Sequence, residues 1–449
     1  MEILTKIKQP ESRKLEFKER FPEKSDILKT IIAFSNGAGG DLIIGVSDKE
    51  RDVVGIKNPL ELEEKISNMI NDSIHPQIVP YIYSMNIEGK VILVIQVLPG
   101  NTTPYFLKSK GLEKGVYIRI GSSNRLANIE IIAELRRKSL GVSYDYNIDR
   151  TLTINDFDSK SIGKFFNKIG VSNHTYRDII KWKFINQNNG DIFPTIAGLI
   201  LFGKEHLFDY EYAGVRVTKF KNNTLADIES TKDFYLPIIS NVENIFIYVL
   251  SLIGKESVLS GVERIEQTII PPYAVRETIV NAIVHRDYSI KSNIKINIFS
   301  DRIEIISPGI LYGNIDIADL GSGLSECRNR NIVRVFRKMN FMEELGTGIY
   351  RIIELYKNKN LQNPEFYEQG NYFRVTLPQI KMAVSKEEII LEIIKSKQEV
   401  SASLLAKELN YHHNTILKYL HKLLEENKVI KMGKGKSSRY KINQSHQVL

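Results

Sequence analysis

The sequence predicts a multidomain protein of the α/β (α+β) class. Residues 14–18 alternate apolar and polar side chains as a strand does, whereas residues 236–254 repeat apolar side chains at helical spacing. At roughly 150 residues per domain, the 449 residues predict about three domains. With 42% hydrophobic and 26% charged residues, the composition is that of a globular protein and argues against extended disorder.

The first 144 residues predict one compact α/β segment. After the strand at 14–18, a helix is expected over residues 26–34, with Ser25 as its N-cap. The glycine-rich residues 36–40 then favour a tight turn. The remaining elements expected here are a buried strand at 41–46, a helix at 60–71, and strands at 91–97 and 115–120.

Acidic, loop-like residues around 145–156 predict a boundary, after which helices and strands are mixed. Residues 194–202 fit either a buried strand or a short helix. Helices are expected at 151–170, 236–254, 266–286 and, broken at Gly346, 328–355; strands are expected at 211–221 and twice within 292–307. Residues 386–449 predict three helices followed by a basic hairpin.

The charge of the chain is concentrated near its C-terminal end. The net charge is +9, and residues 379–449 hold thirteen Lys and Arg against seven Glu. A polyanionic partner would therefore be attracted first to this segment.

The single cysteine and the apolar runs bear on the compartment. Cys327 is the only cysteine, which excludes internal disulfides and suits a reducing cytoplasm. No apolar run approaches the roughly 18 residues of a membrane helix, and the N-terminus lacks the features of a signal peptide. We therefore expect a cytoplasmic location and no membrane partner.

Residues 276–289 (RETIVNAIVHRDYS) place a carboxylate and an amide one helical turn apart. Glu277 and Asn281 are four residues apart, so both lie on one face of a helix. A glutamate at this spacing can act as a general base, and an amide oxygen suits Mg²⁺. The alternative is that both residues belong to a solvated helix face.

Two glycine-containing segments follow this helix. Gly309 lies in the turn ISPGIL after two strands, and Gly346 and Gly348 stand at a predicted helix start in EELGTGI. Backbone N–H groups at such a start can approach phosphate oxygens at the positive end of the helix.

This order of a helix with Glu and Asn, a glycine turn and a glycine pair resembles the GHKL (Bergerat-type) nucleotide-binding fold, an α/β sandwich. The wording of 276–289, 306–311, 328–336 and 343–349 is most similar to the ATP-binding module found beside Schlafen AlbA-like domains in bacterial proteins. These proteins are described as transcriptional regulators or as helicase-related. The resemblance implies ATP and Mg²⁺ as ligands and the following roles: Glu277 activates water, Asn281 binds magnesium, Gly309 lies in the base-side turn, and Gly346, Thr347 and Gly348 form the phosphate lid.

One position departs from the general GHKL pattern. The usual D-x-G-x-G, whose aspartate accepts a hydrogen bond from the adenine amino group, is replaced by Ser307-Pro308-Gly309. Adenine selectivity and ATP hydrolysis therefore stay open at this point.

Acidic residues also gather around the first strand. Glu16 and Lys18 share one face of that strand, an arrangement in which the carboxylate holds a metal and the lysine assists a nucleophilic water. Glu11 can join them only if the chain bends, and Asp48 follows the next strand. The alternative is that these acids are surface salt-bridge partners.

The segments 11–18, 33–48 and 117–125 resemble the Schlafen AlbA-like domain. Some members of that family are metal-dependent RNA endonucleases, and others are described as DNA-binding domains. The resemblance implies Glu11, Glu16 and Asp48 as catalytic and metal-binding acids, with Mg²⁺ or Mn²⁺ as the metal. Phosphate contacts are expected from Arg119, Ser122, Ser123 and Arg125 on the neighbouring loop.

The C-terminal residues resemble a winged helix-turn-helix. A capped helix, a polar turn, a second helix and a basic hairpin follow one another from residue 401. Nucleic-acid contacts are expected from Asn414, Lys418 and Lys422 on the second helix, and from Lys434, Lys436 and Arg439 on the hairpin. The same fold also serves as a protein-docking module.

These resemblances predict an AlbA-like domain at 1–144, a connecting region at 145–261, an ATP-binding domain at 262–380 and a winged helix at 384–449. One hypothesis is an ATP-responsive, DNA-binding transcriptional regulator. A second is a metal-dependent nuclease acting on RNA or DNA in phage defence, with ATP as regulator. A third is an assembly scaffold. We expect nucleic acid as partner and a homo-oligomer.

Overall fold

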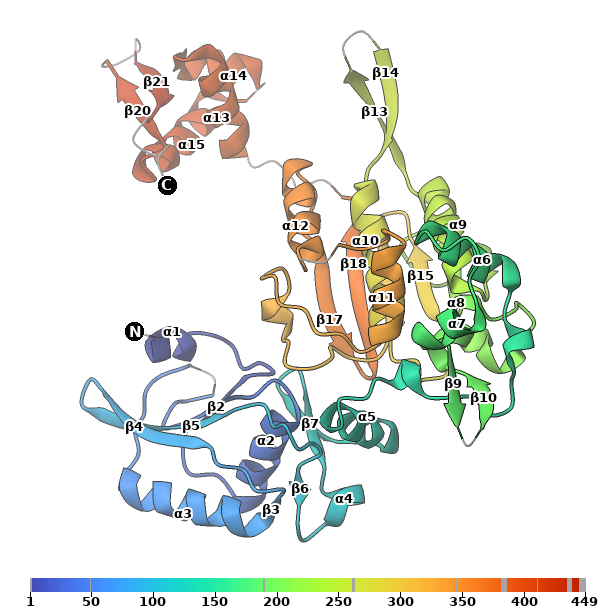
Figure 1. Cartoon of the computed structure of the whole chain (residues 1–449). Coiled ribbons are helices and arrows are strands. Elements are labelled where there is room, and N and C mark those ends of the chain that lie inside the picture. Colours follow the sequence, from blue (N-terminus) through green and yellow to red (C-terminus); the bar gives the residue numbers. More distant parts are fainter. Residues whose placement is uncertain are drawn as a thin grey trace. The chain divides into compact units, whose positions relative to one another are not determined.

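The computed structural model describes residues 2–48, 50–188, 190–260, 263–343, 346–380, 386–409, 411–433 and 438–443. The chain is a mixed α/β protein with two compact units, residues 1–380 and residues 381–449 (Figure 1). Within the described ranges, no helix has the length and apolar character needed to cross a lipid bilayer.

The N-terminal part of the first unit is built on a four-stranded sheet of order β1-β2-β5-β4. Its strands are β1 (Leu15–Lys18), β2 (Gly40–Ile44), β5 (Lys90–Val97) and β4 (Tyr81–Ile87); β1 and β2 are parallel, and the other pairs are antiparallel. Alternate residues of β2 enter different cores, since Leu42 and Ile44 join one cluster and Ile43 another. Helices α2 (Lys24–Asn36) and α3 (Pro59–Ser73) contribute to the first cluster, and α1 (Glu2–Ile7) contributes to the second.

Smaller elements complete this part. They are the pairs β3 (Ile74–His75) with β6 (Phe106–Leu107) and β7 (Tyr117–Ile120) with β8 (Ser123–Leu126), the short helix α4 (Gly111–Lys114), and α5 (Ile129–Ser139). Helix α2 begins at Lys24 after Glu23, so Ser25 lies inside the helix and is not its N-cap. Asn128 caps α5, because its side chain accepts a hydrogen bond from Ile131 N.

The central part contains a six-stranded sheet of order β12-β11-β15-β16-β18-β17. Its strands are β12 (Ile228–Phe234), β11 (Val215–Phe220), β15 (Ile294–Ile298), β16 (Arg302–Pro308), β18 (Tyr372–Pro378) and β17 (Glu365–Gln369). Strand β11 pairs in parallel with β15, and one hydrophobic core runs from Phe157 to Leu377. The expected regions 145–261 and 262–380 therefore share one sheet and one core, and the boundary predicted between them does not separate two folding units.

The helices of the central part pack on this sheet or on one another. They are α6 (Ser159–Lys168), α7 (Tyr176–Lys181), α8 (Ile196–Phe202), α9 (Ile238–Leu252), α10 (Pro272–His285), α11 (Arg330–Lys338) and α12 (Gly348–Asn358), with 3₁₀ turns η1 (Tyr144–Tyr146), η2 (Ile154–Asp156), η3 (Phe208–Ala213) and η4 (Ile317–Asp319). Helix α10 lies against β16 and also contacts α9 and α12. The hairpins β9 (Ile185–Asn188) with β10 (Asp191–Pro194) and β13 (Lys255–Ser260) with β14 (Glu263–Thr268) stand apart from the large sheet.

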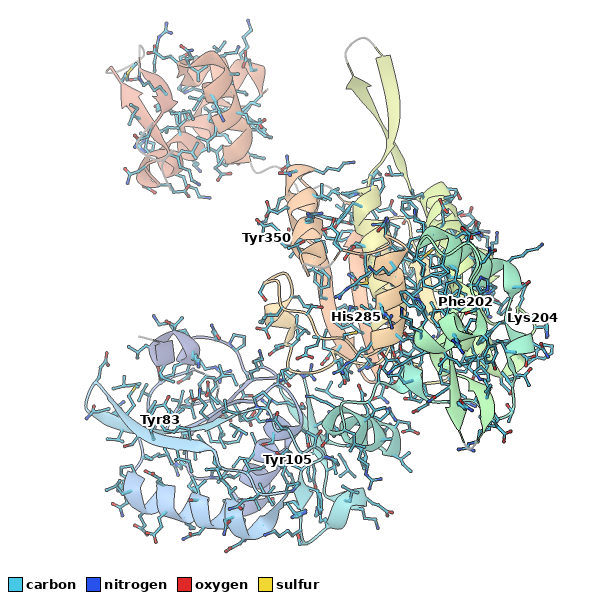
Figure 2. The ribbon with its side chains drawn as sticks, in the orientation of Figure 1. Tyr83, Tyr105, Phe202, Lys204, His285 and Tyr350 are labelled. Carbon is cyan, nitrogen blue, oxygen red and sulfur yellow. The ribbon has the colours of Figure 1, made fainter. Side chains whose placement is uncertain are left out.

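The sequence left residues 194–202 open between strand and helix, and the structure shows helix α8 there. The Thr195 side chain accepts a hydrogen bond from Gly198 N and so caps the helix. The helix expected over 151–170 is shorter, since only Ser159–Lys168 is α-helical and Asp158 caps it. Phe202 lies among the packed side chains, whereas Lys204 and Tyr350 lie at the surface (Figure 2).

The second unit has its own small core. Helices α13 (Lys386–Lys397), α14 (Ala402–Glu408) and α15 (His413–Glu425) are followed by β20 (Val429–Met432) and β21 (Arg439–Ile442), which form a sheet of order β19-β21-β20 with β19 (Val400–Ser401). Ile394, Leu405 and Leu420 are fully buried in this core. The order of three helices and a hairpin agrees with the sequence expectation.

Candidate functional site

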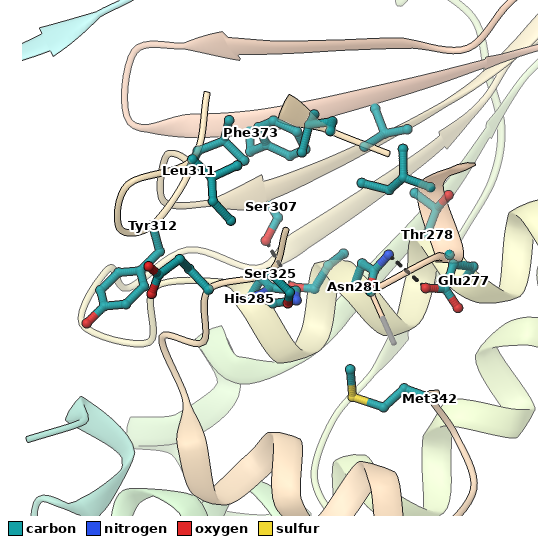
Figure 3. Close-up of a pocket in the computed structure, with 18 of the residues that line it drawn as sticks. Glu277, Thr278, Asn281, His285, Ser307, Leu311, Tyr312, Ser325, Met342 and Phe373 are labelled. Carbon is teal, nitrogen blue, oxygen red and sulfur yellow. Dashed lines mark hydrogen bonds between the residues drawn. The ribbon is translucent and has the colours of Figure 1, made fainter. Parts of the chain in front are cut away.

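Helix α10 presents its carboxylate and amide side by side, as the four-residue spacing predicts. Asn281 Nδ2 donates a hydrogen bond to Glu277 Oε1 over 3.2 Å, and the two side chains point toward each other (Figure 3). Glu277 is only 8% exposed. Burial raises the pKa of the Glu277 carboxyl above its ordinary value, against the opposing hydrogen bond from Asn281.

All six residues proposed for nucleotide contact line one pocket. The pocket lies between α10, the end of β16 and the segment leading into α12. Its lining includes Glu277, Asn281, Gly309, Gly346, Thr347 and Gly348. The structure therefore brings together three segments that are far apart in the sequence.

The two glycines before and at the start of α12 are required for different reasons. Gly346 has φ +64°, a left-handed conformation that glycine adopts without a steric penalty. Gly348 is required by proximity, because a Cβ at this position would lie 1.9 Å from Glu277 Oε1. The glutamate is thus in direct contact with the first residue of α12.

The hydroxyl of Thr347 has unused hydrogen-bonding capacity. Its Oγ1 atom is buried and has no hydrogen-bond partner among the described residues. It lies at the N-terminus of α12, a helix of 11 residues whose first N–H groups also lack partners within the helix. A buried donor at the positive end of a helix fits a phosphate oxygen.

The other walls of the pocket were not predicted from the sequence. His285 lines it one turn beyond Asn281, and burial, with the nearby Arg328 and Arg337, lowers the pKa of His285 to about 4. Arg337, from α11, is a cation in the lining. The pattern Glu277, Asn281, His285 at successive intervals of four could have revealed His285, whereas nothing local indicates Arg337.

Ser307 is the residue that the sequence resemblance aligned with the aspartate of the general GHKL pattern. Its Oγ atom donates a hydrogen bond to Ala282 O over 3.0 Å (Figure 3). The side chain is therefore used to join β16 to α10. Phe373 and Tyr312 add aromatic surface to the same pocket.

Arg13 joins the N-terminal part to the wall of this pocket. Its guanidinium donates hydrogen bonds to Ile315 O over 3.0 Å and to Leu311 O over 3.2 Å, and both of these residues line the pocket. It also pairs with Glu368, which in turn accepts a hydrogen bond from Leu311 N over 2.8 Å. The neighbouring Lys14 forms an ion pair with Asp319. Sequence reasoning missed Arg13, because its partners are about 300 residues away.

The acids near β1 gather around Lys18. Glu16 Oε1 accepts a hydrogen bond from Lys18 Nζ over 2.6 Å, and Glu11 Oε1 accepts one from Phe17 N over 3.0 Å. Burial opposes the charge of Lys18, but Glu16, Asp48 and Glu11 together hold its pKa above the ordinary value. Within the described ranges, no three acidic, histidine or cysteine side chains form a group that could hold a metal ion. The metal-binding triad therefore stays a prediction.

Arg119 does not have the role that the sequence suggested. Its side chain is 2% exposed and donates to Ser12 O over 2.7 Å and to Leu15 O over 3.1 Å. It also pairs with Glu16 and lies over the Phe34 ring. Strand β7 is buried along most of its length, so this arginine is enclosed by protein groups and is not exposed as a phosphate contact would require. Of the other expected contacts, Ser122 lies in the turn between β7 and β8, whereas Ser123 and Arg125 lie on β8; all three are exposed.

In the second unit, the residues expected to contact nucleic acid lie at the surface of α15. Asn414, Lys418 and Lys422 are exposed and line one shallow groove. Lys422 pairs with Glu387 over 2.9 Å. Arg439 is exposed on β21, whereas Lys434 and Lys436 lie outside the described residues.

Comparison with protein families identifies two domains in the chain. Residues 11–128 match the family "Schlafen, AlbA_2", and residues 291–377 match the family "Putative ATP-dependent DNA helicase recG C-terminal". The chain therefore carries a Schlafen AlbA_2 domain followed by a HATPase_c_4 domain of the recG C-terminal type. This confirms the resemblance to the Schlafen AlbA-like domain and to the ATP-binding module found beside it. Gly309, Gly346, Thr347 and Gly348 lie inside the second match, whereas α10, with Glu277 and Asn281, precedes it.

The individual proteins that are similar to this chain share low sequence identity with it. An uncharacterized ATP-binding protein of Ureaplasma parvum serovar 3 is 24% identical over 150 residues, which are 31% of this chain and about two fifths (41%) of that protein. The DIP2311 protein of Corynebacterium diphtheriae aligns over 96% of this chain and 92% of its own, with 17% identity and a TM-score of 0.46. The N-terminal domain of a RecG-related protein of Nitrosomonas europaea aligns over 28% of this chain and 88% of its own, with 27% identity and a TM-score of 0.21.

Proposed function

We propose that this protein binds ATP and nucleic acid, and that ATP changes how it holds DNA, as in a transcriptional regulator. The observation that carries the proposal is the single pocket in which six candidate residues from three segments meet. The HATPase_c_4 match and the ATP-binding relative support the nucleotide, and the Schlafen AlbA_2 match supports the nucleic acid.

The phosphates of ATP would lie at the N-terminus of α12. The Thr347 hydroxyl, which lacks a partner in the described part of the chain, and the first N–H groups of the helix supply donors, and Arg337 adds a positive charge to the lining. Gly348 lets these donors approach because it carries no side chain.

Glu277 and Asn281 would act on a water molecule and a magnesium ion. Burial raises the pKa of Glu277, which makes its carboxylate a stronger base, and the Asn281 amide orients that carboxylate. Because Asn281 donates through Nδ2, its Oδ1 atom is left for a hard cation such as Mg²⁺. When bound, magnesium neutralises the charge of the phosphates.

We also propose a fold class for the nucleotide-binding part and for the second unit. The helices α10, α11 and α12 on the six-stranded sheet fit a divergent GHKL sandwich, and the second unit fits a winged helix with α15 as recognition helix. Asn414, Lys418 and Arg439 would then contact DNA.

The hydrogen bonds of Arg13 supply a route by which the nucleotide acts on the N-terminal domain. Leu311 and Ile315 line the pocket, and their carbonyl oxygens accept hydrogen bonds from an arginine just before β1. A nucleotide that shifts these residues would shift Arg13 and the strand that follows it. A difference of a few kcal/mol between two arrangements would suffice.

The test is ATP binding by wild-type protein and by a variant that loses only the Thr347 hydroxyl. We expect ATP with Mg²⁺ to raise the melting temperature of the wild type, and Thr347→Val to weaken ATP binding about tenfold in calorimetry. Thr224→Val, at an exposed threonine, is the matched control and should bind as the wild type does. A wild-type protein that shows no thermal or calorimetric response to ATP would contradict the proposal.

A metal-dependent nuclease is a second candidate, favoured by the carboxylates that surround Lys18. The test is incubation with transfer RNA, single-stranded DNA and duplex DNA in the presence of Mg²⁺ or Mn²⁺. Cleavage that disappears in Asp48→Asn would support the nuclease, and this exposed position is chosen because its substitution should not disturb the fold. Salt-dependent binding of duplex DNA without cleavage would favour the regulator.

A further inference from the structure

Helix α11 is amphipathic, and its outward positions are all cationic. Ile332, Val333, Val335 and Phe336 are buried in the core, with exposed fractions of 0–4%. The exposed residues of this helix are Arg330, Arg334, Arg337 and Lys338. Arg330, Arg334 and Lys338 follow at intervals of four and therefore share one side.

Two neighbouring segments extend this cationic side. Arg330 Nη1 donates a hydrogen bond to Gly141 O over 3.2 Å, which joins α11 to the residues that follow α5. The Arg334 guanidinium lies 4.0 Å from the centre of the Trp182 ring, which joins α11 to the turn after α7. Helix α11 also contacts η1. We call the five residues Arg137, Lys183, Arg330, Arg334 and Lys338 the cationic ridge.

Aromatic rings hold three cations of the ridge. Besides Arg334 over Trp182, Arg137 lies 5.0 Å from the Tyr144 ring and Lys183 lies 4.7 Å from the Tyr146 ring. Both tyrosines belong to η1. An aromatic face positions a cation without neutralising its charge, so the remaining N–H donors can meet another anion.

No residue of the ridge forms an ion pair with a carboxylate in the described part of the chain. The nearest acids are used inside the fold. Asp145 is fully buried and accepts hydrogen bonds from Ser143 and from the backbone N–H groups of Asn331 and Ile332, and Glu134 pairs with Arg328. Glu134 and Asp287 lie close enough to offset part of the charge of Arg137, but the exposed side of α11 itself carries only positive charges.

We propose that the cationic ridge binds the sugar–phosphate backbone of nucleic acid without reading its sequence. The proposal rests on the nucleic-acid part of the proposed function and adds a surface in the first unit, separate from the loop of Ser122 and from α15. Two features favour phosphate as the ligand: the planar donor fork of arginine matches phosphate, and three such forks lie in the ridge. The same helix contributes Arg337 to the nucleotide pocket, so the two ligands would meet at α11.

The experiment compares the full chain with Arg334→Gln/Lys338→Gln. Binding of fluorescent single-stranded and duplex DNA of about 30 nucleotides or base pairs is followed by anisotropy over a range of salt concentrations. We expect the double variant to bind both kinds of DNA about tenfold more weakly. The slope of log K against log salt concentration should fall by the amount that corresponds to about two phosphate contacts. Lys160→Gln/Lys164→Gln, at two exposed lysines of α6, removes the same charge elsewhere and should leave binding unchanged.

Further readouts separate the possible failures. ATP binding of the double variant should equal that of the wild type, and its thermal unfolding should shift only slightly, because Arg334 loses its contact with the Trp182 ring. Arg334→Lys should retain most of the salt dependence because it keeps the charge. If the double variant and the wild type have equal DNA affinity and equal salt dependence, the proposed role of the ridge is overturned, but the proposed function is not. A wild type that binds no nucleic acid would overturn the proposed function as well. Vesicles of anionic phospholipid are tested as a further ligand. If the double variant loses binding to these vesicles but keeps its binding to DNA, the ridge is a membrane surface and the proposal is rejected.

Discussion

The pocket beside α12 and the acidic cluster beside β1 belong to the same unit, yet they use their polar groups differently. In the pocket, Thr347 Oγ1 is buried and has no hydrogen-bond partner among the residues that the structure describes, and burial raises the pKa of Glu277. In the cluster, Glu16 is bonded to Lys18 and Arg119, and Glu11 to Phe17 N. Because buried polar groups are normally satisfied, the unused capacity of the pocket indicates a ligand, whereas the cluster is satisfied by its own fold.

The largest effect on stability is expected at Glu16, whose substitution tests whether the acidic cluster is satisfied by the fold. Glu16→Ala leaves the buried Arg119 without its carboxylate, and the free energy of unfolding should fall by about 3 kcal/mol in urea denaturation. Asp48→Ala, at an exposed acid of the same cluster, should change it by less than about 0.5 kcal/mol. Equal, small changes in both variants would show that the cluster does not stabilise the fold.

Lowering the pH should reduce the stability of the protein through His285, which lines the pocket. Its pKa of about 4 lies below the ordinary value of 6.5, so between these values the unfolded chain binds a proton that the folded chain does not. The stability that this group contributes is complete above pH 6.5 and is lost as the pH falls toward 4, by at most about 3 kcal/mol. Denaturation at several pH values should show that His285→Gln removes this dependence.

The control for this prediction is His206→Gln, since His206 is exposed and lies outside the pocket. Its stability should follow the wild-type pH profile. If His285→Gln keeps that profile too, His285 is not held neutral by its surroundings.

Disturbing the contact between Gly348 and Glu277 should have a smaller effect on stability and a direct effect on ATP binding. Gly348→Ala would place a Cβ against Glu277 Oε1, which should cost about 1–3 kcal/mol of stability and abolish ATP binding in calorimetry. Gly163→Ala is the matched control, because this α6 glycine has open space around it and alanine favours a helix. Wild-type ATP affinity in Gly348→Ala would mean that the nucleotide binds elsewhere.

The smallest expected effect concerns the connection between the two regions. In Arg13→Ala, Leu311 O and Ile315 O lose their donor, so the influence of ATP on DNA affinity should shrink by about 1 kcal/mol. The measurement is DNA binding with and without ATP, and Lys8→Ala, at an exposed lysine, should behave as the wild type does. An unchanged ATP effect in Arg13→Ala would exclude this arginine as the route.

The sequence was informative where one helix or one turn decides the geometry. The interval of four between Glu277 and Asn281 predicts their contact, and the glycine pair predicts the start of α12, because both follow from helical periodicity. The short helix α8 was left open, since seven apolar residues fit either a buried strand or a helix.

The sequence was uninformative where partners are distant in the chain. Arg119 looked like a surface residue of a loop, and only the packing of β7 against β1 and α2 encloses it. Likewise Arg13 has no local signal, because its acceptors lie in the segment before α11. The parallel pairing of β11 with β15 was missed for the same reason, since strand partners are chosen by the whole fold.

That pairing decides where the chain can be cut. A fragment that starts at residue 262 would keep α10 and the pocket residues but would lose β11 and β12, together with the apolar side chains of α8 and α9. Strand β15 would then present an open edge of unpaired N–H and C=O groups, which invites aggregation. A soluble recombinant version of the nucleotide-binding part should therefore begin near residue 145, well upstream of the matched family segment.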